Sequence, residues 1–403
     1  DTQIKPARDA YNSLTDHQKT LVDSTKLDKL VRLEAQLNAW TITEGDGQTW
    51  YKGSGKSLSF TVNGQSRKFD GIRQGSTYIG SGVSSLLTAS GEMDKPFTLT
   101  LKPEFLQCQT PGEHSFAVWY SGLYSGDLSI SVTYTVETPA NYLDVTNKPE
   151  FEGKTTVTVD GKEYPIEEMA GYLQRIPTQR YVNLPETGDL LTIYSFKDGT
   201  PTGSYTNYPT GMQVFRITRQ EGGAKAEEIT EFANLLNYAG CSIRLTGTKG
   251  IRMITGISEN ARTALTGARG LGGYTLEEYG TVVMRGVGTP TLENSKSHNF
   301  AYKKGKADPV FARVGGMIQY TNVLVGFGLE DCKDTLTLRP YIKLKDMTTG
   351  ETVTLYGGCV SRSIGYIAKQ NENTYQPGTA GYKYVHEIID AVYGKTEQGG
   401  ETK

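Results

Sequence analysis

The sequence contains few cysteines and histidines, and it lacks any long apolar run. Four cysteines and four histidines among 403 residues are too few for a disulfide-stapled scaffold, and no two cysteines have the spacing of a zinc-ligand pair. No run of about 18 apolar residues is present, so no membrane-spanning segment is predicted. These absences argue against disulfide-rich, zinc-binding and membrane-inserted proteins, and the sequence predicts neither a metal nor a cofactor.

The four cysteines are Cys108, Cys241, Cys332 and Cys359. Complete pairing allows three connectivities, and the sequence does not select among them. Cysteine is among the most frequently buried residue types, so four free and buried thiols are the first interpretation. One disulfide within the C-terminal part of the chain is the alternative.

The chain also lacks an excess of charge of either sign. Lys+Arg 42 against Asp+Glu 44 gives a formal net charge of −2, which provides no global attraction to nucleic acid or anionic lipid. Glycine and tyrosine, by contrast, are abundant, with 47 and 25 copies. Because tyrosine favours strands and glycine favours turns, the composition predicts a turn-rich, mainly β protein. At about 150 residues per domain, the length corresponds to two or three domains.

Residues 1–39 follow a helical period. Apolar residues recur with helical spacing at Ala7, Ala10, Tyr11 and Leu14. Thr15 followed by Gln18 matches a capping box, so a second helix is expected to begin at Asp16. This small helical segment buries little apolar surface by itself, so we expect it to pack on a neighbour or to belong to a longer helical array.

Residues 40–137 change to a period of two. Alternating apolar residues predict strands over 58–62, 97–101, 116–120 and 130–136. Turn-forming pairs such as Asn63-Gly64 and Ser90-Gly91 separate them. Short alternating strands at this spacing predict an antiparallel β-sandwich of immunoglobulin type.

Residues 138–395 mix strands with helices. Thr138-Pro139-Ala140 is the predicted linker, and Asp160-Gly161 predicts a tight β-hairpin. Helices are predicted over 167–175, 227–238, 364–369 and 379–392. Strands otherwise dominate, which favours an α+β domain over alternating βαβ units. A division of this region into two subdomains near 230–240 stays open, and 396–403 is predicted to be a disordered tail.

The predicted fold class is therefore mainly β with α+β: a helical segment (1–39), an Ig-like β-sandwich (40–137) and a C-terminal mixed α+β module (138–395). Three parts of the chain resemble modules of secreted surface proteins from Gram-positive, gut-type anaerobes. Short helical repeats between such modules resemble ARDAYNSLTDHQKTLVDSTKLDKLVRLEAQL, and the openings of their Ig-like modules resemble GDGQTWYKGSGKSLSFTVNG. An uncharacterised C-terminal module is similar to six separated motifs: YPTGMQVFRI, GIRMITGIS, EEYGTVVMRG, FAYKKGKADPVFAR, QYTNVLVGF and LYGGCVSRSIGYIAKQN. The resemblance implies an extracellular, cell-surface or wall-associated multi-module protein, and it implies no activity and no site residues.

Two glycine-rich segments resemble nucleotide-binding loops without matching them. In Gly53-Ser54-Gly55-Lys56-Ser57 the first glycine of a phosphate loop would fall at Trp50, and the surroundings are strands. We interpret this segment as a turn at a strand edge. Gly270-Leu271-Gly272-Gly273 lacks the final glycine of the dinucleotide motif and is interpreted as a loop after a helix.

No catalytic residue is predicted. Cys359 with His386 or His298 is the only conceivable cysteine–histidine pair in the last module, and a buried cysteine with surface histidines is the preferred interpretation. Glu277-Glu278 heads a predicted strand and Glu167-Glu168 a predicted helix, so both pairs are interpreted as structural. Calcium-loop and serine-hydrolase motifs are absent.

Aromatic residues carry the functional prediction. The predicted binding residues flank a loop of the C-terminal module and a hairpin of the sandwich: Tyr194, Tyr205, Tyr208, Trp119, Tyr120 and Tyr124. Exposed rings of this kind stack on sugars or anchor a protein partner. The alternative is that they fill cores and strand surfaces. Arg339, Arg362 and Lys343 would present positive charge to an acidic glycan or form a solvated face.

The predicted function is non-enzymatic: a surface protein that binds a glycan or another protein, with no nucleic acid as partner. The C-terminal module would be the recognition unit, and the helical segment and sandwich would be spacers. Two alternatives stay open, namely a carbohydrate-active or peptide-cleaving enzyme with its site in 140–395, and a purely architectural segment. A lysine–asparagine isopeptide crosslink in the sandwich is a further hypothesis.

Overall fold

The computed structural model describes residues 3–38, 41–63, 69–91, 96–120, 130–172, 176–197, 208–295, 297–306 and 310–394. It is mainly β and divides into two compact units. Unit 1 comprises Asp1–Glu150, Glu167–Asn183 and Arg219–Ala224. Unit 2 comprises Phe151–Ile166, Leu184–Thr218 and Lys225–Lys403. The predicted linker Thr138-Pro139-Ala140 thus lies inside unit 1, together with three segments that follow it in the sequence.

The chain begins with the predicted helices, α1 (Ile4–Asn12), α2 (Asp16–Thr20) and α3 (Ser24–Asn38). The capping box of α2 is confirmed: the Thr15 hydroxyl accepts from the Gln18 backbone N–H, and the Gln18 side chain accepts from the Thr15 N–H. No residue of α1 or α2 is buried, and Leu21 is 74% exposed. These helices therefore bury little apolar surface by themselves, as predicted.

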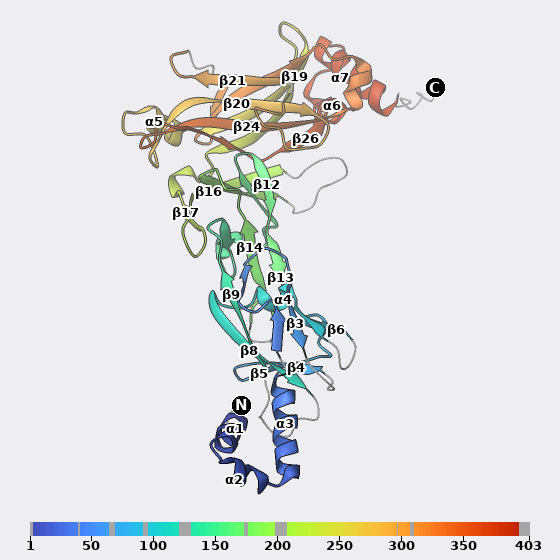
Figure 1. The fold of residues 1–403 in the computed structure, drawn as a ribbon. Helices are drawn as coiled ribbons and strands as arrows, with labels where there is room; N and C mark the ends of the chain where they lie inside the picture. The colour runs from blue at the N-terminus through green and yellow to red at the C-terminus, as the bar shows by residue number, and fades with distance from the viewer. Residues whose placement is uncertain are drawn as a thin grey trace. The chain divides into compact units, whose positions relative to one another are not determined.

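Two sheets of unit 1 form the β-sandwich (Figure 1). The first sheet has the order β1 (Thr41–Glu44), β3 (Leu58–Asn63), β7 (Phe97–Leu101), β6 (Leu87–Ser90). The second has the order β2 (Gln48–Tyr51), β9 (Ile130–Glu137), β8 (Gly112–Tyr120), β4 (Phe69–Gln74), β5 (Thr77–Gly80). In chain order these are the A-B-E-D and G-F-C-C′ arrangements of immunoglobulin-type sandwiches, with β2 added parallel to β9.

Aromatic rings occupy the centre of the sandwich, where antibody domains carry a disulfide between strands B and F. Phe60 on β3 meets Phe116 on β8 edge to face, with ring centroids 5.5 Å apart. The ring of His114, two residues before Phe116, lies 2.7 Å from the carbonyl oxygen of Thr110. His114 thus takes the place of the tyrosine that anchors this corner in antibody domains. At this position the two sheets are joined by the packing of Phe60 against Phe116.

A three-stranded sheet completes unit 1, in the order β10 (Tyr142–Asp144), β14 (Gln179–Asn183), β13 (Glu167–Met169). The helix predicted over 167–175 is therefore wrong where the structure describes it, and 173–175 lie outside the described residues. Glu168 faces Arg180 across the strands, and Arg180 Nε lies 2.7 Å from Glu168 Oε1. This cross-strand pairing outweighs the helical character of the local sequence.

Unit 2 contains three antiparallel sheets. The first has the order β12 (Lys162–Pro165), β11 (Thr156–Val159), β15 (Leu190–Lys197), β16 (Tyr208–Thr218), β17 (Lys225–Glu228). The second has the order β18 (Leu236–Arg244), β19 (Gly250–Ser258), β23 (Met317–Val325), β22 (Ala312–Val314). The third has the order β21 (Ser297–Lys303), β20 (Tyr274–Arg285), β24 (Thr335–Asp346), β25 (Thr352–Tyr356), and β26 (Val360–Ser363) also pairs with β24. Asp160 and Gly161 both have positive φ, 48° and 79°, which confirms the predicted tight hairpin between β11 and β12.

Three helices accompany these sheets: α5 (Glu259–Thr266), α6 (Ile364–Gln370) and α7 (Ala380–Tyr393). The two predicted C-terminal helices are confirmed, and they lie beside each other at one end of the sheets (Figure 1). In α7 the side chains of Val385, Ile388 and Ile389 are buried in the core that α6 shares. The helix α5 precedes the 270–273 loop, as predicted. The predicted tail 396–403 lies outside the described residues.

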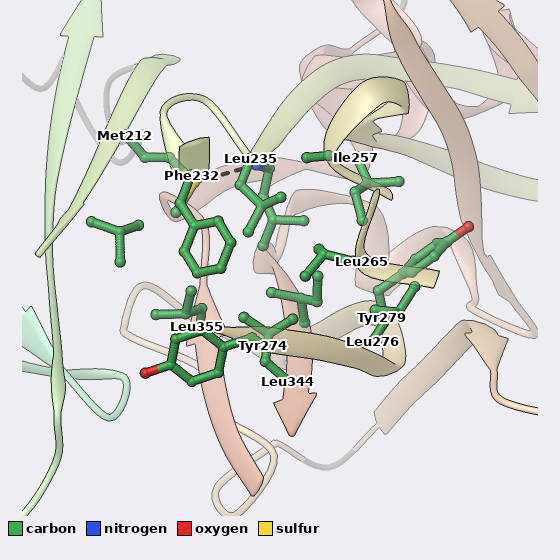
Figure 2. Close-up of a cluster of buried hydrophobic side chains, with 14 of the residues drawn as sticks. Met212, Phe232, Leu235, Ile257, Leu265, Tyr274, Leu276, Tyr279, Leu344 and Leu355 are labelled. Carbon is green, nitrogen blue, oxygen red and sulfur yellow. Dashed lines mark hydrogen bonds between the residues drawn. The ribbon is translucent and has the colours of Figure 1, made fainter. Parts of the chain in front are cut away.

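The helix predicted over 227–238 is wrong. These residues form the end of β17, a short 3-10 helix (Thr230–Phe232) and the start of β18. Phe232 and Leu235 enter one core together with Met212 and Tyr274 (Figure 2). Asn234, at φ 53°, lies outside the helical region. The apolar spacing that suggested a helix therefore serves an irregular turn whose side chains share one core.

Candidate functional site

Only two of the predicted binding residues have described side chains. Tyr124 and Tyr205 lie outside the described residues, and so do the side chains of Tyr120 on β8 and Tyr208 on β16. The remaining two, Trp119 and Tyr194, have very different surroundings.

Tyr194 on β15 is held inside unit 2 by its hydroxyl group. The hydroxyl donates to the backbone oxygen of Tyr356 at 2.7 Å and accepts from Arg339 Nη2 at 3.1 Å. Burial of the hydroxyl raises the pKa of Tyr194. Its polar end thus belongs to an interior network rather than to a ligand surface.

Arg339 on β24 is the centre of that network and is only 1% exposed. Its Nε donates to the carbonyl of Gly357 and its Nη1 to the carbonyl of Gly161, each at 2.8 Å. The Tyr356 ring centroid lies 4.8 Å from the guanidinium carbon. Within the described ranges no carboxylate forms an ion pair with Arg339. The prediction that Arg339 presents charge at the surface is therefore wrong, because the β11–β12 turn covers it.

The other two predicted cations are also engaged locally. Lys343 Nζ lies 3.4 Å from Glu278 Oε1. Arg362 donates to the carbonyl of Ser361 at 2.7 Å, and its guanidinium lies 5.5 Å from the ring centroid of Tyr366. These contacts give the three residues no common surface for an acidic glycan.

Trp119 instead lies on the outer face of the second sandwich sheet. The alternation of β8 turns Phe116 and Val118 into the core and leaves Trp119 half-buried on the opposite face. The ring of Tyr78 on β5 stands at 71° to that of Trp119, with centroids 6.4 Å apart, and Tyr78 is 48% exposed. The Arg73 guanidinium carbon on β4 lies 5.5 Å from the Trp119 ring centroid. We call the surface formed by Trp119, Tyr78 and Arg73, together with Gly71 and Gly80, the aromatic face.

The strand register places these side chains together. Gly71 pairs with both Trp119 and Gly80, and Arg73 pairs with Tyr78. A Cβ at Gly71 would lie 2.3 Å from the carbonyl oxygen of Ile79, so no other residue fits there. A Cβ at Gly80 would lie 3.6 Å from the Tyr78 ring. The glycine pair therefore leaves bare backbone beside Trp119, and the Tyr78 ring lies over part of it.

Asp70 fixes the orientation of Tyr78. The Tyr78 hydroxyl donates to Asp70 Oδ2 at 2.8 Å and lies 3.0 Å from the Asp70 backbone oxygen. The pKa of Tyr78 is raised to about 12, and the two largest causes are desolvation of the hydroxyl group and then its hydrogen bond to Asp70. The phenol thus stays protonated at neutral pH and keeps its ring in one position.

Tyr78 and Arg73 were not among the binding residues predicted from the sequence. The signal was the two-residue turn Gly75-Ser76, with Gly75 at φ 56°, which joins β4 to β5 and sets Arg73 opposite Tyr78. Reading that turn would have placed both side chains on one face. Their closeness to Trp119 follows from the β4–β8 pairing, which no local pattern contains.

The glycine-rich segment 53–57 forms the expected turn after β2. The Gly53 N–H donates to Gln107 Oε1 at 2.9 Å, and Asn183 Nδ2 donates to the Gly53 carbonyl at 2.9 Å. The N–H and the carbonyl of Gly53 thus both bind protein side chains, which fits a structural role.

The thiols show no sign of catalytic activation. None of the four cysteines forms a disulfide in the structure; Cys332 is buried and the others are half-buried. Burial raises the pKa of each, and that of Cys332 to about 11. Among charged groups, Arg339 has the largest influence on the Cys359 thiol, and its positive charge lowers the pKa of that thiol. The His386 ring lies beside the ring of Tyr382 on α7, with centroids 3.9 Å apart. The side chain of His298 lies outside the described residues.

These thiols should alkylate slowly in the folded protein. With its pKa at about 11, Cys332 would be ionised in about one molecule per thousand at pH 8. Iodoacetamide at that pH is expected to modify Cys332 only after denaturation, when all four cysteines react, as counted by intact mass. A mass about 2 Da lower before alkylation would instead reveal a disulfide.

Two hollows of unit 2 contain polar side chains. An enclosed cavity of about 80 Å³ is lined by apolar and amide groups that include Met212, Asn237 and Met317. An open depression of about 210 Å³ is bordered by Arg285, Asp331 and Asp334, but Arg285 pairs with both aspartates. Neither hollow combines a nucleophile with a base.

Across the parts of the chain that are described, no three histidine, cysteine or acidic side chains are grouped to hold a metal ion. In the same residues, no helix is both long and apolar enough to cross a membrane.

Comparisons with known proteins identify no family. No family profile matches the chain, and no curated protein matches it. Among solved structures it is similar to domains A168–A170 of titin, at 11% identity and TM-score 0.19, over 81% of this chain and 99% of that one. It is also similar to immunoglobulin domains 1–5 of Sidekick-1, at 10% identity and TM-score 0.16, over 79% of this chain and 58% of that one. Similarity this low carries no argument, so the sandwich is defined by its own strand order.

Proposed function

We propose that the chain is a non-enzymatic binding segment of a multi-module protein, and that its ligand binds the aromatic face of the sandwich. The observation that supports this is the pair of rings, Trp119 and Tyr78, held at 71° and 6.4 Å on an outer sheet face beside Arg73. Rigid aromatic rings provide contact area at little entropic cost. The proposal moves recognition from the C-terminal module to the sandwich.

We further propose that the protein is extracellular, bacterial and attached to the cell surface or wall. Its ligand would be a glycan or a surface protein, and its role would be adhesion. The support for this proposal is the resemblance of the three sequence segments to modules of such proteins. The proposed modules are 1–39, 40–137 and 138–395. No described feature favours the enzymatic alternative.

Trp119→Ala is expected to weaken ligand binding about tenfold or more, because loss of a central aromatic contact typically costs about 2 kcal/mol. The measurement is binding of the full chain to a glycan array, followed by calorimetry on each glycan that binds. Tyr51→Ala is the control, since Tyr51 is an exposed aromatic residue on β2 of the same sheet and lies outside the aromatic face. Equal binding by wild type and Trp119→Ala, or no glycan bound at all, would contradict recognition of a glycan by this face.

A further inference from the structure

We infer that the ligand of the aromatic face is a saccharide that carries a carboxylate, such as a uronic acid residue, with Arg73 binding the carboxylate and the two rings contacting the sugar. This inference rests on the proposed function and specifies its ligand class.

The size of the apolar patch favours a sugar over a protein. Among the described residues, the other outward positions of β8 and β9 carry small or polar side chains: Ala117, Ser115 and Glu113 on β8, and Ser131, Thr133 and Thr135 on β9. A stable protein interface buries about 800 Å² on each partner around an apolar centre. Two rings inclined at 71° over a glycine pair provide much less apolar area, which suits one or two pyranose rings.

Arg73 supplies the charge that selects an acid. It is exposed, and among the described residues it forms no ion pair. Its guanidinium carbon lies 5.5 Å from the Trp119 ring centroid, a cation–π contact that restricts the side chain without neutralising it. The planar guanidinium donates two parallel hydrogen bonds to the two oxygens of a carboxylate. A hydroxyl or amide group of a neutral sugar does not offer such a pair of acceptor oxygens.

The nearby carboxylate does not compete for Arg73. Asp70 Oδ2 accepts a hydrogen bond from the Tyr78 hydroxyl at 2.8 Å, so its role is to hold that ring. The positive charge of Arg73 is therefore left for a ligand, and it lies beside the Trp119 ring, which is the surface on which a sugar stacks.

The test uses the full chain on a panel of immobilised glycans that carry uronate or N-acetylneuraminate, each beside its neutral counterpart. Wild type is expected to prefer the acidic member of a pair. Arg73→Gln is expected to reduce binding of the acidic member about tenfold or more, and so to reduce or abolish the preference for the acidic over the neutral member. Trp119→Ala should weaken both. Arg73→Lys keeps the charge but loses the paired hydrogen bonds, so it should recover only part of the binding.

Arg269→Gln provides the control for net charge, because Arg269 is an exposed arginine of unit 2. Thermal melting of each variant checks that the fold is kept. If wild type prefers the neutral glycans, or Arg73→Gln binds the acidic ones as well as wild type, the inference is wrong while the proposed function stands. If Trp119→Ala also binds like wild type, or no glycan binds, both the inference and a glycan site on this face are wrong.

Discussion

Replacement of Arg339 by methionine is expected to lower the free energy of unfolding by about 3–5 kcal/mol. The side chain is 1% exposed and donates to two backbone carbonyls and to the Tyr194 hydroxyl. Methionine fills similar volume but leaves these acceptors without a donor, and each unsatisfied buried group costs about 1–3 kcal/mol. Denaturant unfolding of the full chain, followed by circular dichroism, measures the loss.

The control for this variant is Arg313→Met. Arg313 is exposed and pairs with Glu259 at the surface, where such pairs contribute about 0–1 kcal/mol. Arg339→Lys should remain clearly destabilised, because one ammonium cannot reproduce the planar set of donors. Equal stability of Arg339→Met and Arg313→Met would show that the buried network contributes nothing, and the interior role assigned to Tyr194 would lose its support.

Phe116→Ala should have an effect of similar size on the sandwich. Phe116 is 2% exposed, and its ring meets Phe60 edge to face at 5.5 Å across the two sheets. Truncation removes this contact and leaves a cavity, which typically costs about 3–5 kcal/mol. The same unfolding measurement applies.

Two further variants bracket the result for Phe116. Phe116→Leu keeps most of the volume and is expected to cost less than half as much as the alanine variant. Tyr51→Ala removes an exposed ring from the same sheet and should change stability by about 0.5 kcal/mol or less. If Phe116→Ala proves as stable as Tyr51→Ala, the interpretation of the Phe60–Phe116 pair as the link between the sheets is wrong.

Local signals predicted those parts of the fold that local interactions determine. The Thr15–Gln18 capping box, the Asp160-Gly161 turn and the apolar stripe of the last helix each act within a few residues, and each was confirmed. The helices predicted over 167–175 and 227–238 failed because strand pairing and a shared core outweigh helical spacing. Such contacts join residues far apart in the sequence, and a single sequence does not record them.

The same distinction applies to the candidate site. Trp119 was found because it flanks a predicted hairpin, whereas Arg73 and Tyr78 reach it only through the pairing of β4 with β8 and β5. The alternation of β24 places Arg339 on the face of the sheet that was predicted to meet solvent. The prediction failed because the turn at Gly161, far away in the sequence, covers that face. Which face of a strand meets solvent depends on what else folds over it.

The aromatic centre of the sandwich has a consequence for how this protein can be made and handled. Phe60 and Phe116 occupy the positions at which antibody domains carry the disulfide between their two sheets. No disulfide therefore has to form at this place before the two sheets pack together. Reductant should leave the melting temperature of the sandwich unchanged. Expression in a reducing bacterial cytosol should give properly folded material without an oxidative refolding step.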